Sequence, residues 1–78
     1  MAAKAFVLIE TSVGNTSRVA GLLKGYPGVE AVDIVTGPYD IIATIGGNDM
    51  SSIADLVTGE VHGIGGVVRT TTCVAVGT

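Results

Sequence analysis

Residues 36–40, Thr-Gly-Pro-Tyr-Asp, carry more chemical groups than a tight turn requires. Glycine and proline are ordinary turn residues, whereas Tyr39 adds an aromatic ring with a hydroxyl and Asp40 adds a carboxylate. A carboxylate can receive the ammonium group of a small ligand in a charge-assisted hydrogen bond. The alternative is that Asp40 closes the turn through its own side chain. Gly37, Tyr39 and Asp40 are therefore candidate ligand-binding residues, and both roles of Asp40 stay open.

A second candidate is the run of threonines at residues 70–72. Alternation along a strand places the hydroxyls of Thr70 and Thr72 on one face, about 7 Å apart. Such hydroxyls could hold the carboxylate of a ligand. Threonine also favours strands for packing reasons alone, so a ligand role and a structural role both remain possible.

Catalytic and metal chemistry have little support in the sequence. Nucleophilic catalysis needs a base such as histidine beside a serine or cysteine, and the chain has one histidine, His62, and one cysteine, Cys73. We expect His62 to end a helix, where positive charge is favoured, and Cys73 to be a buried structural residue of a strand. Because a closed zinc site needs about four nitrogen or sulfur ligands, we expect no catalytic residue, no metal site and no cofactor.

The elements that must position these residues follow from hydrophobic periodicity. Strands are predicted over residues 5–10, 29–36, 40–45 and 67–76, with Val68, Thr70 and Thr72 on one face of the last strand and Val67 on the other. Asn15 is expected to cap a first helix, and Asn48 or Asp49 a second; residues 63–66 form the turn before the last strand. The expected core faces are Val19, Leu22, Leu23 and Tyr26 in the first helix and Met50, Ile53, Ala54, Val57 and Val61 in the second.

This order, βαββαβ, predicts an α+β fold of the ferredoxin-like type, a four-stranded antiparallel sheet with two helices on one face. Right-handed crossovers place the first and third strands in the centre of the sheet. The short connection at residues 37–39 makes the second and third strands a hairpin. Residues 1–78 are expected to form a single domain.

The composition indicates that this domain associates with other subunits. The chain has 78 residues, 47% hydrophobic and only 14% charged, with a mean hydropathy of +0.63. A domain of this size buries only about 60% of its unfolded surface and has a thin stability margin. The longest apolar run, residues 5–9, is far too short for a membrane span. The run lacks alternation, so its strand should be covered on both faces, and a second subunit is the available cover.

The charge distribution argues against direct binding to nucleic acid. The net charge is −3, and the four basic residues are scattered along the chain rather than gathered on one face. The beginning of the sequence is too short for a secretory signal, and a single unpaired cysteine suits a reducing compartment. We therefore expect a cytoplasmic protein that binds neither DNA nor a membrane.

Three sequence elements in order carry a family resemblance: Pro27-Gly28-Val29, then residues 35–40 with Gly-x-Tyr-Asp, then Gly66-Val67 followed by residues 70–74. Over essentially the whole chain the sequence resembles the effector-binding domain of the leucine-responsive regulatory protein/AsnC family, the RAM domain. The Gly-x-Tyr-Asp turn is the most specific element. Usual family members carry a helix-turn-helix DNA-binding domain, so this sequence resembles a stand-alone form.

The resemblance implies dimers that pack sheet against sheet and assemble into rings, commonly octamers and sometimes decamers. Amino-acid effectors would bind in clefts between dimers, at Gly37, Tyr39 and Asp40 together with Thr70 and Thr72. The chain would act by joining full-length Lrp/AsnC regulators in mixed assemblies. The alternatives are a structural assembly subunit without ligand and an enzyme of the dimeric α+β barrel type. The related ACT domain, whose ligand lies near a glycine after the first strand, would instead use Gly14.

Overall fold

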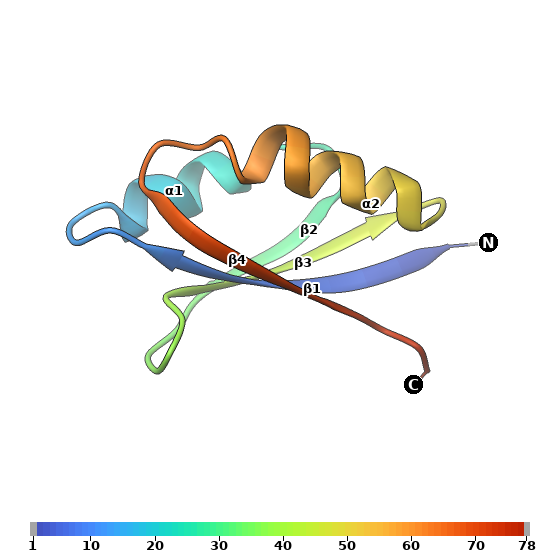
Figure 1. Ribbon diagram of the computed structural model, residues 1–78, viewed down its shortest axis with the longest axis horizontal. Coiled ribbons are helices and arrows are strands. Elements are labelled where there is room, and N and C mark those ends of the chain that lie inside the picture. The colour runs from blue at the N-terminus through green and yellow to red at the C-terminus, as the bar shows by residue number, and fades with distance from the viewer. Residues whose placement is uncertain (1, 78) are drawn as a thin grey trace.

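The computed structural model describes residues 2–77 as a four-stranded antiparallel sheet with helices on one face (Figure 1). The elements are β1 (Ala3–Thr11), α1 (Thr16–Leu23), β2 (Val29–Ile34), β3 (Ile41–Gly47), α2 (Met50–Leu56), the π-helical turn η1 (Val57–Val61) and β4 (Val67–Val74). The strand order is β2-β3-β1-β4, so β1 and β3 occupy the centre as predicted. This is the ferredoxin-like βαββαβ fold, and the predicted hairpin of β2 and β3 is confirmed.

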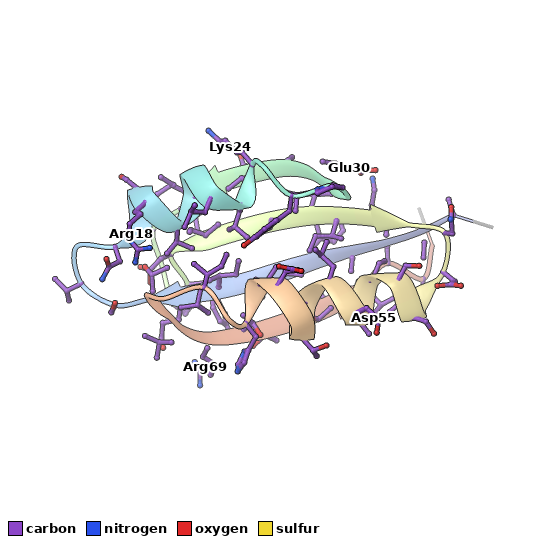
Figure 2. All side chains as sticks on the ribbon, turned by 90° about the horizontal axis from the view of Figure 1, so that it is seen from above. Arg18, Lys24, Glu30, Asp55 and Arg69 are labelled. Atoms are coloured by element: carbon purple, nitrogen blue, oxygen red, sulfur yellow. The ribbon has the colours of Figure 1, made fainter. Side chains whose placement is uncertain are left out.

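The core lies between the sheet and the helices; seen from above, α1 lies toward the β2 edge of the sheet and α2 toward the β4 edge (Figure 2). Alternate residues of β1 and β3 face this layer because successive side chains of a strand point to opposite sides. The helices and the turn after η1 contribute the other half. The buried core residues are Ala5, Val7, Ile9, Val19, Ala20, Leu23, Ile41, Ala43, Ile45, Ile53, Val57, Val61 and Ile64.

The face of the sheet opposite the helices, here called the outer face, is also apolar at its centre. Phe6 is 38% exposed, and its neighbours Leu8 and Ile42 are half-buried. Leu8 pairs directly with Ile42 across β1 and β3, so their side chains lie together. The lack of alternation in β1 thus has two sources, a buried inner face and an apolar outer face that no element within residues 2–77 covers.

Two irregularities in the sheet overturn predicted strand faces. Alternation predicts Val29 and Ala31 on one face of β2 and Val32 on the other, but a bulge between Val29 and Ala31 brings Val29 to the helix-facing side. Val29 and Val32 therefore both pack against the core. A register shift at the end of β1 pairs Val67 with Thr11, and Val67 rather than Val68 packs against the core. A bulge inserts one extra residue and so reverses the alternation expected from the sequence. Both β2 and β4 also end earlier than predicted, at Ile34 and Val74.

The helices lie where the sequence predicts them, but some of their buried residues and one of their caps differ from the prediction. In α1 the buried residues are Val19, Ala20 and Leu23, whereas Leu22 is 47% exposed; the small side chain of Ala20 lets the helix lie close to the sheet. Asn15 does occupy the N-cap position of α1, but its side chain makes no capping hydrogen bond, so the expected side-chain cap was wrong. The alternative Asp49 is correct for α2, because its Oδ1 accepts a hydrogen bond from the Ser52 amide at 2.9 Å. In α2 itself only Ile53 is buried, and Met50 is 41% exposed while Ala54 is exposed.

Candidate functional site

The connection between β2 and β3 extends from the outer face of the sheet, away from the helices (Figure 1). The amide of Val35 donates to the Asp40 carbonyl at 2.9 Å and closes the connection. Gly37 has φ +141°, a backbone conformation that L side chains rarely adopt. A β-carbon built at this position would meet no atom within 4 Å. Glycine is therefore required here by the backbone angle, and the space beside it is open.

Asp40 fastens this connection to the end of β1. Its Oδ2 accepts hydrogen bonds from the Thr11 amide at 2.8 Å and from the Thr11 hydroxyl at 3.2 Å. Its own amide donates to the Ile9 carbonyl at 2.9 Å. The single hydroxyl proton of Thr11 is given to Asp40, so Thr16 donates in the 2.7 Å contact between the two threonine hydroxyls. The half-buried Asp40 carboxylate therefore holds three elements together: the β2–β3 connection, β1 and the start of α1.

Tyr39 reaches in the other direction, to β4. Its hydroxyl lies 3.2 Å from the hydroxyl of Thr71, and either group can donate. Thr71 is exposed and pairs with Leu8 across β1 and β4, which places it on the outer face. The residue of the threonine run that contacts the connection within one subunit is thus Thr71, which was not among the predicted site residues.

Thr70 and Thr72 do share one face, as alternation predicts, but it is the helix-facing side. They pair with Ile9 and Val7, both buried against the helices. Thr70 is half-buried and Thr72 is exposed, since β4 is an edge strand. A single subunit therefore brings Gly37, Tyr39 and Asp40 together but leaves Thr70 and Thr72 on the other side of the sheet.

The outer face near this connection carries one further polar pair that sequence reasoning missed. Glu10 and Arg69 are directly paired across β1 and β4, with their charged atoms 3.9 Å apart. They stand next to the Leu8–Thr71 pair on the same side of the sheet. The sequence could have predicted this pair. The predicted strand order makes β1 and β4 neighbours, and strand alternation puts Arg69 and Thr71 on one face.

Hydrogen bonds also tie the loop after β1 to the turn before β4. Arg18 donates to the Asn15 Oδ1 at 3.1 Å and to the Gly65 carbonyl, reaching from α1 toward that turn (Figure 2). The Ser12 amide donates to the Gly66 carbonyl at 2.8 Å. Asn15 donates through Nδ2 to the Ser12 hydroxyl at 2.8 Å, which explains why its side chain does not cap α1. These hydrogen bonds hold the loop against the turn before β4.

The two residues with nucleophilic or basic side chains stand apart from this region. His62 follows η1 as its C-terminal cap and is exposed, as expected for a helix-ending residue. Cys73 is exposed, and the prediction of a buried cysteine was wrong because it faces outward opposite Phe6. Among residues 2–77, no group of three or more His, Cys, Asp or Glu side chains could hold a metal ion. No helix in this part of the chain is long and apolar enough to cross a membrane.

A depression of about 250 Å³ opens at the β2 edge of the molecule. It is lined by Lys24, Val29, Glu30, Ala31 and Val32, and Figure 2 shows Lys24 and Glu30 along this edge, opposite the edge that carries Arg69. None of the five predicted ligand residues lines this depression.

Comparison with known proteins places the fold in a family. The sequence model of the Lrp/AsnC ligand binding domain matches residues 4–78. No curated protein matches in sequence. The protein TTHA0845 from Thermus thermophilus is 33% identical, with a TM-score of 0.93, and the match covers 97% of this chain and 95% of that one.

Two similar structures of longer proteins share the fold. Escherichia coli AsnC is 16% identical with a TM-score of 0.91, covering 97% of this chain and 52% of AsnC. The transcriptional regulator NMB0573 of Neisseria meningitidis, solved as a complex with L-Met, is 17% identical with a TM-score of 0.83, covering 96% and 50%. This chain spans about half the length of each. From the family match over nearly its whole length, we conclude that the chain belongs to the Lrp/AsnC ligand-binding domain family.

Proposed function

We propose that this protein binds a free amino acid as an effector and assembles into homo-oligomers. The observation that carries the proposal is the match of residues 4–78 to a family of ligand-binding domains. The structurally similar regulator from Neisseria meningitidis was solved with L-Met, which supports an amino acid as the ligand class. A binding domain of this family gives no reason to assign catalysis, so the barrel-enzyme alternative is set aside.

The proposed ligand site includes the β2–β3 connection with Gly37, Tyr39 and Asp40. Thr70 and Thr72 lie on the opposite face of the same subunit. For these threonines to reach the same ligand, they must come from a neighbouring subunit. The proposed cleft therefore lies between subunits, which links ligand binding to assembly.

Assembly is supported by the outer face of the sheet. Phe6, Leu8 and Ile42 form an apolar patch there that is not fully buried within one subunit. Exposed apolar patches of this kind are typical of protein–protein interfaces. We propose that two sheets pack against one another through this patch and that such dimers form rings of the octameric or decameric type.

The chain spans 95% of the Thermus protein but 52% of AsnC. We propose that this domain acts in the cytoplasm and modulates longer regulators by entering their assemblies. Coexpression with a full-length Lrp/AsnC regulator and native mass spectrometry would test this. Mixed oligomers support the proposal, whereas strictly separate assemblies contradict it.

Isothermal titration of the unmutated protein with the twenty amino acids tests the proposed ligand class. Saturable heat with at least one amino acid is the expected result. An oligomer that gives no heat with any of them would instead favour the structural assembly subunit, the alternative that shares the same fold and interface.

A further inference from the structure

Both edges of the sheet carry apolar side chains that are wholly or partly exposed. The strand order β2-β3-β1-β4 makes β2 and β4 the edge strands. On β2, Ile34 is 58% exposed and Val32 is half-buried. At the end of β4, Val74 is 42% exposed, and Val76 just beyond it is 97% exposed. The two residues of each pair are two positions apart, so each pair lies on one side of its strand.

Both pairs belong to the helix-facing side of the sheet. Val32 and Ile34 pair with buried residues of β3, and Val74 pairs with the buried Ala5 of β1. Alternation gives Val76 the same side as Val74. Two edges placed side by side would therefore bring apolar side chains against apolar side chains.

The backbone at these edges is also available for pairing. The Ala75 amide donates to the Lys4 carbonyl at 2.9 Å, so alternation directs the amides and carbonyls of Val74 and Val76 away from β1. Carried through the pairing of β1, β3 and β2, the same alternation leaves the amide and carbonyl of Val32 on the open edge of β2. An open edge of this kind is a template for a further strand.

A depression and a projecting segment lie at these opposite edges. The depression of about 250 Å³ follows the β2 edge, with Val29, Val32 and Lys24 among its lining residues. Residues 75–77 continue beyond β4, and Figure 1 shows them leaving the sheet on the side away from the helices. The two edge strands are separated by three strand spacings, or about 14 Å. The segment therefore reaches the depression of another subunit rather than its own.

The proposed packing of two outer faces brings these edges together. Each neighbouring pair of strands is antiparallel, so β2 and β4 also run in opposite directions. A twofold axis along the strands preserves strand direction and exchanges the two edges of the sheet. β4 of one subunit then lies beside β2 of its partner in the antiparallel direction, and the same contact occurs at both sides of the dimer.

We propose that residues 74–77 of each subunit add as a strand to the β2 edge of the partner, with Val76 opposite the partner's Val32 and Val74 opposite the partner's Ile34. This register pairs apolar residues with one another and places Val76 at the depression. It also covers both open edges, which otherwise could pair with other chains. The inference rests on the proposed sheet-to-sheet assembly and names the segment that joins the two subunits.

Engineered cysteines at facing positions test this register. Ala75 and Asp33 are exposed and become direct neighbours in it, with Cα atoms about 4.5 Å apart, a distance that a disulfide spans. In a Cys73→Ser background, Asp33→Cys with Ala75→Cys should give a covalent dimer as the main product of oxidation. The distance of about 14 Å between the edge strands excludes a disulfide within one subunit. Asp33→Cys with Val13→Cys, in the exposed loop after β1, is the matched control and should give no dimer on a non-reducing gel.

Val76→Ser measures what the apolar contact contributes. A valine side chain that becomes fully buried strengthens association about tenfold or more, so the dimer dissociation constant should rise by at least about that factor. Val13→Ser makes the same change at a residue that is 102% exposed and should leave the constant unchanged. Sedimentation equilibrium measures the dissociation constants, and thermal unfolding verifies that each variant is folded.

The inference is overturned if the unmutated protein is an oligomer but Asp33→Cys with Ala75→Cys yields no covalent dimer. It is also overturned if Val76→Ser dissociates no more readily than Val13→Ser. Either result leaves the proposed packing of the outer faces standing. A monomeric unmutated protein removes the proposed assembly and the inference together.

Discussion

Replacing Phe6 by glutamate should dissociate the subunits that we propose to pair through the outer face of the sheet. Phe6 is 38% exposed in one subunit, and complete burial of a phenylalanine side chain is worth roughly 1.5–3 kcal/mol. Covering the remaining 38% therefore contributes about 0.6–1.1 kcal/mol per subunit, or ~1–2 kcal/mol per dimer. A glutamate in the same interface adds a desolvation cost of several kcal/mol for each unpaired charge. Because about 1.4 kcal/mol changes an equilibrium constant tenfold, the dimer dissociation constant should rise at least about a hundredfold.

Sedimentation equilibrium at low micromolar concentration measures this change. Val13→Glu is the matched control, since Val13 is 102% exposed in the loop after β1 and the substitution alters the net charge equally. We expect the control to sediment like the unmutated oligomer and Phe6→Glu to shift toward the 7.8 kDa monomer. An oligomer of unchanged size in Phe6→Glu, or a monomeric unmutated protein, would refute the assignment of the outer face as the interface.

Three further predictions concern stability. Hydrogen bonds from the Ser52 amide and hydroxyl lower the pKa of Asp49 below its ordinary value of 3.8, so its contribution to stability is present above that pH and is lost as the pH falls through the lowered pKa. Asp49→Asn keeps an acceptor for α2 and should remove this part of the acid sensitivity, measured by urea unfolding at pH 7 and pH 3; an unchanged pH dependence would count against the cap. Gly66 has φ +104°, and a β-carbon there would lie 2.8 Å from the Arg18 guanidinium, so Gly66→Ala should destabilise the protein by about 1–3 kcal/mol. Gly21→Ala, in α1 with open space around it, should instead stabilise it by about 0.5–1 kcal/mol, and thermal unfolding curves that shift in the same direction for both variants would contradict this pair of predictions.

Element order and strand order were predictable because strong local signals mark where the elements begin and end. The apolar run at residues 5–9 and the turn residues 37–38 are strong local signals, and handedness rules then leave few topologies. Side-chain direction was less predictable, since one inserted residue reverses it. The bulge beside Glu30 and the shift near Thr11 changed the faces of Val29 and Val67, and neither position carries a glycine or proline to mark it.

The candidate site illustrates the same limit. Spacing correctly paired Thr70 with Thr72, but only the register between β1 and β4 shows that Thr71 shares a face with Tyr39. Asparagine is a residue type that often caps helices, yet hydrogen bonds with Ser12 and Arg18 occupy the Asn15 side chain. Cys73 follows an apolar strand pattern, but a strand at the edge of a small sheet has one face without cover in a single subunit. Tertiary contacts, which a local pattern does not contain, decided the first and third of these cases, whereas the partners of the Asn15 side chain are three residues away in the sequence.

Native mass spectrometry of the unmutated protein, with and without L-methionine, tests most directly the claim that this chain is an oligomeric amino-acid-binding domain. We expect an oligomer built from 7.8 kDa subunits that takes up the amino acid in a fixed ratio to its subunits, or that already carries a small molecule as purified. A monomer that acquires no mass from L-methionine or from any other amino acid would contradict both parts of the claim.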